Sequence, residues 1–213
     1  MYESFSYRPL TKFDQQFSQE NGFEINSPIL FELLNSLPQE NYYEILDVLP
    51  ARQAIVDSFS DFHCKLFLPG CMNELYAMTV DQYDTENKIH RALVKQFGFY
   101  KKQRASLNVI LLWDLPNYLD KQVMTGLVEY LSEHVHEQVK LHFYIHTKQQ
   151  MPSSPGVYSV LPGGKVCLEN SDDTTIKCPR YYKESLQTLF QPFKVKRSMQ
   201  LSSGLQEYIM TFK

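Results

Sequence analysis

The feature that most constrains the fold is an almost unbroken apolar run near the middle of the chain. Residues 107–113 read Leu-Asn-Val-Ile-Leu-Leu-Trp, and Asp114 and a Leu-Pro-Asn turn follow directly. A short apolar run that ends at a turn is typical of a strand buried on both faces. Such strands form sheets with helices on both sides, and ligands bind beyond the carboxyl ends of the strands. We therefore expect Asp114 to lie at a ligand-binding edge.

The composition predicts one globular domain and excludes several kinds of partner. The chain has 213 residues, of which 43% are hydrophobic and 21% charged, enough for one domain with a full core. The net charge of −3 and the pI near 6.1 give no basic excess, so we expect no nucleic-acid or membrane partner. No signal peptide or membrane-spanning run is visible, and a cytoplasmic location is expected. The cysteines lack CxxC spacing, so no metal site is expected: Cys64, Cys71, Cys167 and Cys178.

Apolar periodicity predicts strands that alternate with helices from residue 27 onwards. Ser27 and Pro28 give a helix start, since Ser caps helices and Pro is tolerated at the first helical position. The connections between strands are long enough for parallel pairing, so we expect an α/β fold with a three-layer, Rossmann-like and mostly parallel sheet. Strands are expected at 43–48, 63–68, 107–113 and 139–145, and helices at 29–37, 52–59, 87–102 and 121–134.

The last third of the chain changes character and predicts antiparallel strands. Residues 152–179 are rich in Ser, Pro, Gly and Asp, and Pro162-Gly163-Gly164 is a hairpin signal between two apolar stretches. A helix is expected near 182–190, and strands at 193–201 and 206–212 are separated by a Ser-Ser-Gly turn. The fold should therefore end on a C-terminal antiparallel β-hairpin.

No repeat, low-complexity tract or linker divides the chain into two domains. We expect residues 1–26 to form an N-terminal arm and residues 27–213 to form a single α/β domain with an insertion at about 147–180. The arm is rich in aromatic residues and poor in charge, which is typical of a segment that docks on its own domain or on a neighbour. Its aromatic residues are Tyr2, Phe5, Tyr7, Phe13 and Phe17.

Three stretches together resemble the class I S-adenosylmethionine-dependent methyltransferase fold. Residues 44–51 resemble the first strand and the glycine-rich loop after it, and residues 108–119 resemble the fourth strand and its active-site loop. Residues 189–198 with 204–210 resemble the closing hairpin, whose last strand inserts antiparallel into a seven-stranded sheet. The resemblance extends from about Tyr43 to Lys213.

The resemblance implies a cofactor pocket built from the loops after three strands. The loop after the first strand, the end of the second strand and the active-site loop would contact S-adenosylmethionine. The positions that match these parts are Asp47, Leu49, Ala51, Gly70, Asp114 and Tyr118. Pro162-Gly163-Gly164 offers a second registration, because many family members carry Pro-Gly-Gly before the fifth strand. We prefer residues 139–145 as that strand, since they directly follow the helix after Asp114.

The chain departs from the family pattern where the cofactor would be held. The loop at 48–54 reads Val-Leu-Pro-Ala-Arg-Gln-Ala and lacks the glycines that let a backbone approach a ligand closely. The family carries an acidic residue at the end of the second strand, but Pro69 and Cys71 flank Gly70 here. Losing such an acceptor costs about 1.5–3 kcal/mol of binding. We therefore expect a vestigial pocket that takes no cofactor.

Several polar residues also have simpler interpretations. Asp114 is as well suited to cap the helical turn that follows it as to contact a ligand. Asp47 is a remnant of the family pattern or, equally well, a strand-end carboxylate that accepts hydrogen bonds from loop amides. His142 and His146 lie on one face of their strand, but about 13 Å apart, too far to share a metal ion. A metal site is therefore not expected.

The chain resembles the methyltransferase fold in its strands but lacks the glycines of the cofactor loop, and this combination predicts a degenerate, non-catalytic methyltransferase-fold protein. It would bind or scaffold a protein partner, either another protein or a second copy of the chain, through its arm or its insertion. The alternative is an active S-adenosylmethionine-dependent methyltransferase that acts on a small molecule with an atypical cofactor loop. A third interpretation is a binding protein for another nucleotide-like ligand.

Overall fold

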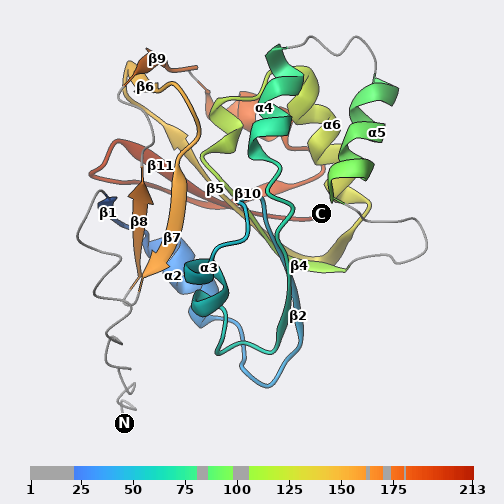
Figure 1. Ribbon diagram of the computed structural model, residues 1–213, viewed down its shortest axis with the longest axis vertical. Coiled ribbons are helices and arrows are strands. Elements are labelled where there is room, and N and C mark those ends of the chain that lie inside the picture. The colour runs from blue at the N-terminus through green and yellow to red at the C-terminus, as the bar shows by residue number, and fades with distance from the viewer. Residues whose placement is uncertain (1–21, 81–85, 98–105, 162–163, 170–173, 180) are drawn as a thin grey trace.

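A six-stranded sheet runs through the molecule (Figure 1). The computed structural model describes residues 22–80, 86–97, 106–161, 164–169, 174–179 and 181–213. The aromatic residues of the expected arm lie outside these ranges. The sheet order is β3 (Cys64–Phe67), β2 (Tyr43–Asp47), β4 (Leu107–Trp113), β5 (Val135–His146), β11 (Leu205–Thr211) and β10 (Lys194–Gln200).

The pairing confirms a mixed α/β fold with a mostly parallel central sheet. Strands β3, β2, β4 and β5 are parallel neighbours, and β11 lies antiparallel between β5 and β10. The last strand of the chain is thus inserted antiparallel beside β5, as the methyltransferase resemblance implies. The preferred registration is also confirmed, because β5 contains residues 139–145 and follows β4 in the sheet.

Helices cover both faces of the sheet. Helix α2 (Pro28–Asn35) packs on β11 and β10, whereas α6 (Lys121–Ser132) contacts α4 (Met72–Val80), α5 (Glu86–Phe97) and α7 (Lys183–Leu189). Phe190, just after α7, stacks on Phe143, whose side chain points to the face opposite α2. Figure 1 shows α4, α5 and α6 grouped together, away from α2. None of the helices in the described ranges is long and apolar enough to cross a membrane.

A buried carboxylate anchors the start of α2. Glu207 of β11 accepts hydrogen bonds from the N–H groups of Ile29 (3.1 Å) and Leu30 (2.8 Å) and from the Ser27 hydroxyl. Its Oε1 also lies 3.0 Å from Nε2 of His142. Burial raises the pKa of Glu207, but the hydrogen bond and charge of His142, with the donors from Ser27 and Leu30, outweigh burial and hold the pKa below its usual value. Negative charge at a helix N-terminus is favourable, so Glu207 fixes α2 on the sheet.

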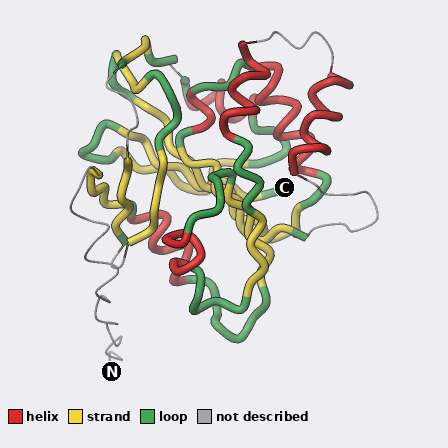
Figure 2. The backbone as a smooth tube through the Cα atoms, in the orientation of Figure 1, coloured by secondary structure: helices red, strands yellow, loops and turns green. Residues whose placement is uncertain are grey.

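The insertion forms small sheets of its own beside the central one (Figure 2). Strands β7 (Val157–Leu161) and β8 (Lys165–Glu169) pair antiparallel, which confirms the predicted hairpin strands. Strand β1 (Gly22–Asn26) adds to the other side of β8, so residues expected in the arm join the insertion. Strands β6 (Gln150–Pro152) and β9 (Thr175–Lys177) pair separately. Helix α3 (Gln53–Ser58) packs against β7 and connects this sheet to the domain.

Three element boundaries differ from the sequence expectations. Strand β5 begins at Val135, four residues early, because its first residues are exposed and polar and give no apolar signal. Helix α5 ends at Phe97, and the expected residues 98–102 lie outside the described ranges. Helix α4 was not expected, because its apolar residues are spread around the helix and do not mark one face.

Candidate functional site

The candidate site lies where β2 and β4 end side by side. Asp47, the last residue of β2, is fully buried, and its Oδ1 accepts hydrogen bonds from Leu49 N–H (2.9 Å) and Trp113 Nε1–H (2.7 Å). Its Oδ2 has no hydrogen-bond partner among the residues that the structure describes. Burial raises the pKa of Asp47 to about 7, although the two hydrogen bonds act to lower it. A carboxyl group that titrates near neutrality at a strand end is typical of a functional site.

Trp113 ends β4 with a strained backbone. Its φ angle is 52°, in the left-handed region that bulky residues rarely adopt. The indole is fully buried, donates to Asp47, and stacks on Tyr158 of β7 with ring centroids 4.9 Å apart and ring planes 5° apart. Strained residues persist where surrounding contacts hold them, and they cluster at ligand sites. Trp113 thus connects the sheet edge to the inserted strands.

Asp114 contacts the insertion and does not cap the turn that follows it. The turn Leu115–Asn117 has no side-chain cap, and both Asp114 oxygens lie 3.2 Å from the donating N–H of Gly156. His146 Nε2 lies 3.5 Å from Asp114 Oδ2. The capping interpretation of Asp114 is therefore wrong, because the inserted segment brings a donor that the local sequence does not contain.

Asn117 fixes the turn instead of Asp114. Its amide nitrogen donates to the carbonyl oxygens of Asp114 (2.6 Å) and Tyr144 (3.0 Å), and its amide oxygen accepts from His146 N–H (2.9 Å). These three bonds join the end of β4 to the end of β5. The Asp114 carboxylate is consequently left to contact Gly156 and His146.

Two buried tyrosine hydroxyls face the Asp114 carboxylate. The Asp114 carboxylate acts on the hydroxyls of Tyr118 and Tyr158 both as a charge and as a hydrogen-bond acceptor, although neither hydroxyl forms a bond of strict geometry with a described residue. Burial, and then the negative charge of Asp114, raise the pKa of both tyrosines. Tyr118 also packs against Met151 and Cys178 of the insertion. Both hydroxyls therefore remain neutral and are directed at the Asp114 carboxylate.

The predicted loop residues are close together but differ in exposure. Leu49 is fully buried and Ala51 is exposed. Gly70 has φ of +60°, and a Cβ atom there would lie 3.2 Å from the Cα of Pro50. The glycine thus allows one loop to pack tightly against the other. Glu74, the nearest following carboxylate, is exposed on α4.

The structure therefore places all six predicted residues at the carboxyl ends of the parallel strands. It brings Asp114 and Tyr118 together, and it places Asp47 beside the loop of Leu49. Their role as cofactor contacts remains a prediction. Sequence reasoning missed Tyr158 and Gly156 because they lie in the insertion, and only the Trp113-Asp114 pair gave a local signal.

In the described ranges no three His, Cys, Asp or Glu side chains are placed to hold a metal ion.

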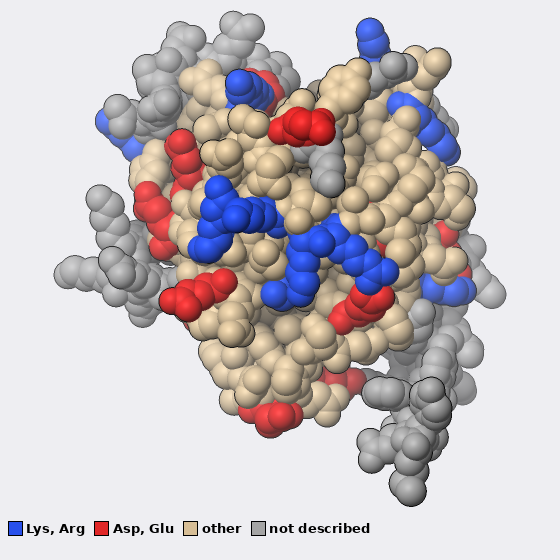
Figure 3. Space-filling model, turned by 180° about the vertical axis from the view of Figure 1, so that it is seen from behind, with Lys and Arg blue, Asp and Glu red and all other residues tan. Residues whose placement is uncertain are grey.

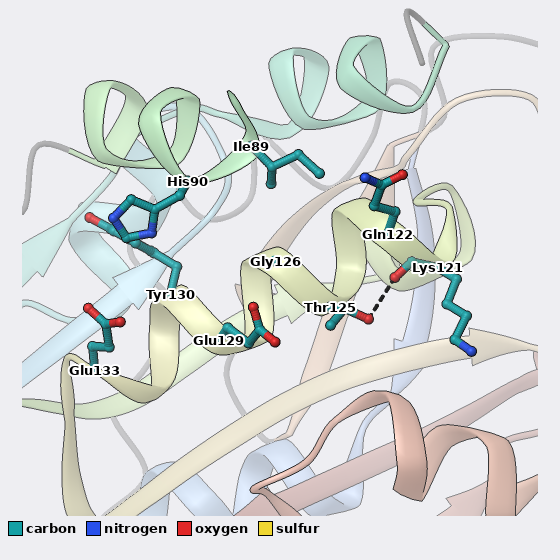
Figure 4. Close-up of a pocket in the computed structure, with 9 residues that line it drawn as sticks. All are labelled: Ile89, His90, Lys121, Gln122, Thr125, Gly126, Glu129, Tyr130 and Glu133. Atoms are coloured by element: carbon teal, nitrogen blue, oxygen red, sulfur yellow. Dashed lines mark hydrogen bonds between the residues drawn. The ribbon is translucent and has the colours of Figure 1, made fainter. Parts of the chain in front are cut away.

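A separate pocket of about 510 Å³ lies between α5 and α6 (Figure 4). Ile89 points from α5 toward Gly126 of α6, where the missing side chain allows the helices to approach. Glu129 of α6, Glu133 directly after that helix and His90 of α5 line one end. We call Asp47, Trp113, Asp114, Tyr118, His146 and Tyr158 the strand-end cluster. None of the residues that line the pocket belongs to it, so this pocket is not part of the candidate site.

No family model and no curated protein matches the chain. Similar solved structures include the glycopeptide N-methyltransferase MtfA with S-adenosylmethionine, at 11% identity and a TM-score of 0.48, covering 96% of this chain and 100% of that one. The pyocyanin biosynthetic protein PhzM is 11% identical at a TM-score of 0.47, covering 85% and 53%. A methyltransferase from Aquifex aeolicus is 10% identical at 0.44, covering 89% and 91%. At these values the likenesses carry no argument about activity.

The comparison corrects one sequence-based prediction. Structures of MtfA are recorded with S-adenosylmethionine, S-adenosylhomocysteine and sinefungin, and this finding contradicts the prediction of no cofactor. That prediction weighed only the missing loop glycines and an absent acidic residue, whereas Asp47 and Asp114 are retained at the strand ends. The sheet order and the antiparallel last strand agree with the class I S-adenosylmethionine-dependent methyltransferase fold, and in the described ranges this sheet has six strands where that fold has seven.

Proposed function

We propose that the strand-end cluster is a ligand site, that S-adenosylmethionine is its ligand, and that the chain methylates a small molecule. The observation that best supports this is a group of buried polar side chains at the strand ends: among the described residues Asp47 Oδ2 has no hydrogen-bond partner, and the hydroxyls of Tyr118 and Tyr158 face the Asp114 carboxylate. Unsatisfied buried groups are rare in native proteins, and each one needs an explanation such as a ligand or a catalytic role. MtfA, complexed with S-adenosylmethionine, suggests which ligand to test.

Asp47, Tyr118 and Tyr158 have the chemistry to hold a polar ligand. Asp47 Oδ2 can accept hydrogen bonds, and the hydroxyls of Tyr118 and Tyr158 can donate or accept them. When bound, S-adenosylmethionine supplies an activated methyl group. On the protein side, His146 is suited to take a proton from the substrate, because its Nε2 lies near the Asp114 carboxylate and its side chain is only partly buried.

The insertion must move before an adenosyl group can enter. Leu49, Trp113 and Tyr158 are fully buried, so their side chains fill the space at the strand ends in this arrangement. An aromatic stack contributes about 0.5–1.5 kcal/mol beyond the area it buries, whereas micromolar binding provides about 8 kcal/mol. Ligand binding can therefore offset the separation of Tyr158 from Trp113.

Isothermal titration calorimetry with S-adenosylmethionine and S-adenosylhomocysteine tests this proposal. We expect micromolar binding to the unmodified protein, and binding weakened about tenfold or more in Asp47→Ala and Tyr118→Phe, since each loses one acceptor or donor. Asp57→Ala and Tyr182→Phe are matched controls, because both side chains are exposed, and they should bind as the unmodified protein does. Absence of binding by both ligands at millimolar concentration would overturn the proposal.

A partner-binding module is a second candidate function. It is favoured by the closure of the strand-end cluster, since Tyr158 and Gly156 of the insertion contact Trp113 and Asp114 directly. The same calorimetry separates the candidates, because a module that works only through its surface should bind neither S-adenosylmethionine nor S-adenosylhomocysteine. Its partner would be another protein or a second copy of the chain.

A further inference from the structure

A cluster of basic side chains lies on the C-terminal strands, away from the strand-end cluster. Lys140 of β5 pairs with Thr211 of β11, and Thr211 pairs with Lys194 of β10, so the three residues form one row across the sheet. Lys196 is the extra residue of a bulge next to this row, and Arg197 follows it. We call Lys140, Lys194, Lys196 and Arg197 the basic surface.

The basic surface is separated from the strand-end cluster along the strands. Lys140 lies midway along β5, about 20 Å before His146, which ends that strand and approaches Asp114. Strand β10 runs parallel to β5, and Lys194 is its first residue. Figure 3 shows Lys and Arg side chains gathered across the middle of the face seen from behind. A ligand on this surface would therefore not compete with one at the strand ends.

Most of this positive charge is uncompensated. Arg197 forms an ion pair with Glu32 of α2, but Lys140, Lys194 and Lys196 have no ion pair with any residue in the described ranges. Burial, and then the positive charge of Lys196, lower the pKa of Lys140. Neighbouring like charges destabilise the fold, although the chain as a whole carries a net charge of −3. An anionic partner would remove this repulsion.

Protection of a sheet edge explains only part of the surface. Strand β10 is an edge strand, and lysines and bulges on edge strands prevent aggregation. Lys140, however, belongs to β5, the third strand from that edge, and it is half-buried. A lysine there does nothing for the edge, so edge protection does not explain why it lies beside Lys194.

We propose that the basic surface binds an extended acidic segment of a partner protein. Adjacent strands are about 4.8 Å apart, which places Lys140 and Lys194 about 10 Å apart, and Lys194 and Lys196 about 7 Å apart along β10. Carboxylates two residues apart on an extended chain lie about 7 Å apart on one face, which matches this spacing. The negative charge elsewhere on the molecule disfavours a long polyanion such as nucleic acid and favours a short acidic segment.

Fluorescence anisotropy with a labelled twelve-residue peptide of alternating Glu and Ser tests this proposal. We expect saturable binding at low salt that weakens as salt is added, because exposed charge pairs are screened. The triple variant K140Q/K194Q/K196Q should bind about tenfold or more weakly, since each exposed pair contributes modestly. The control variant K95Q/K121Q/K177Q changes the net charge equally at exposed lysines elsewhere and should bind as the unmodified protein does.

Each other outcome counts against the proposal. Equal weakening by both triple variants would mean that overall charge, and not this surface, attracts the peptide. Tighter binding of a twelve-nucleotide single-stranded DNA than of the peptide would overturn the choice of a protein partner. No binding of the peptide at low salt would overturn the proposal itself. If the triple variant does not fold, K140R/K194R/K196R should retain binding and K196Q alone should weaken it, or the proposal fails.

Discussion

The buried carboxyl group of Asp47 gives the protein a pH-dependent stability that can be worked out from its surroundings. Burial raises its pKa from 3.8 to about 7. Between these values the folded state keeps a proton that the unfolded state has lost, so the free energy of unfolding falls as pH rises through this window. A shift of about three units corresponds to about 4 kcal/mol, and the loss should be complete above pH 7.

The substitution Asp47→Asn isolates this effect. The amide oxygen can still accept from Leu49 N–H and Trp113 Nε1–H, but the side chain no longer ionises. The new NH₂ group takes the place of Oδ2, which has no partner, and costs about 1–3 kcal/mol at every pH. We expect the variant to be less stable than the unmodified protein at pH 4 and more stable by about 1–3 kcal/mol at pH 8.

Urea unfolding at pH 4, 5, 6, 7 and 8 measures this directly. Far-UV circular dichroism and the fluorescence of Trp113, the one tryptophan in the chain, should give the same midpoint. Asp57→Asn is the matched control, because that side chain is exposed and its effect should not vary with pH in this way. A stability difference for Asp47→Asn that stays constant within about 1 kcal/mol from pH 4 to 8 would refute the reasoning.

Three further substitutions test the packing around the sheet. Glu207→Gln should destabilise the fold by about 3–5 kcal/mol, since it breaks a buried pair with His142 and removes the charge at the start of α2. Thermal unfolding measures this loss, and a loss under about 1 kcal/mol would contradict the anchoring role. Gly70→Ala should cost about 1–2 kcal/mol, because it places a Cβ at positive φ against Pro50, and unchanged urea unfolding would show that the loops can separate freely. Asp120→Ala should cost about 1 kcal/mol of stability, because it removes the cap of α6. Amide hydrogens in the first turn of α6 should then exchange faster. Protection equal to that of the unmodified protein would mean that packing alone holds the turn.

The central sheet was largely predictable because its strands carry their own signal. Residues 107–113 form an apolar run that only a doubly covered strand can bury, and β4 matches that range. The alternation at 206–212 similarly predicted the last strand. Strand β1 was missed because five residues with two apolar side chains mean little until β8 lies beside them. Helix α4 was missed for the same reason, since its buried residues depend on neighbouring helices.

The candidate site was only half predictable. Asp47 and Asp114 follow apolar strands, and parallel strands bring their carboxyl ends to one edge, so their proximity to that edge was expected. The contacts of Tyr158 and Gly156 were not, because they join residues more than forty positions apart and depend on how the insertion folds. The left-handed backbone of Trp113 was also invisible, since no local residue type requires it.

The most direct test of the account is a titration of the unmodified protein with S-adenosylmethionine while the emission of Trp113 is recorded. Trp113 stacks on Tyr158 and donates to Asp47, so a ligand that displaces the inserted ring must change the surroundings of the indole. The account predicts a saturable change in emission that Tyr118→Phe weakens and Tyr182→Phe leaves intact. Emission that stays constant up to millimolar ligand would contradict a ligand site at the strand ends.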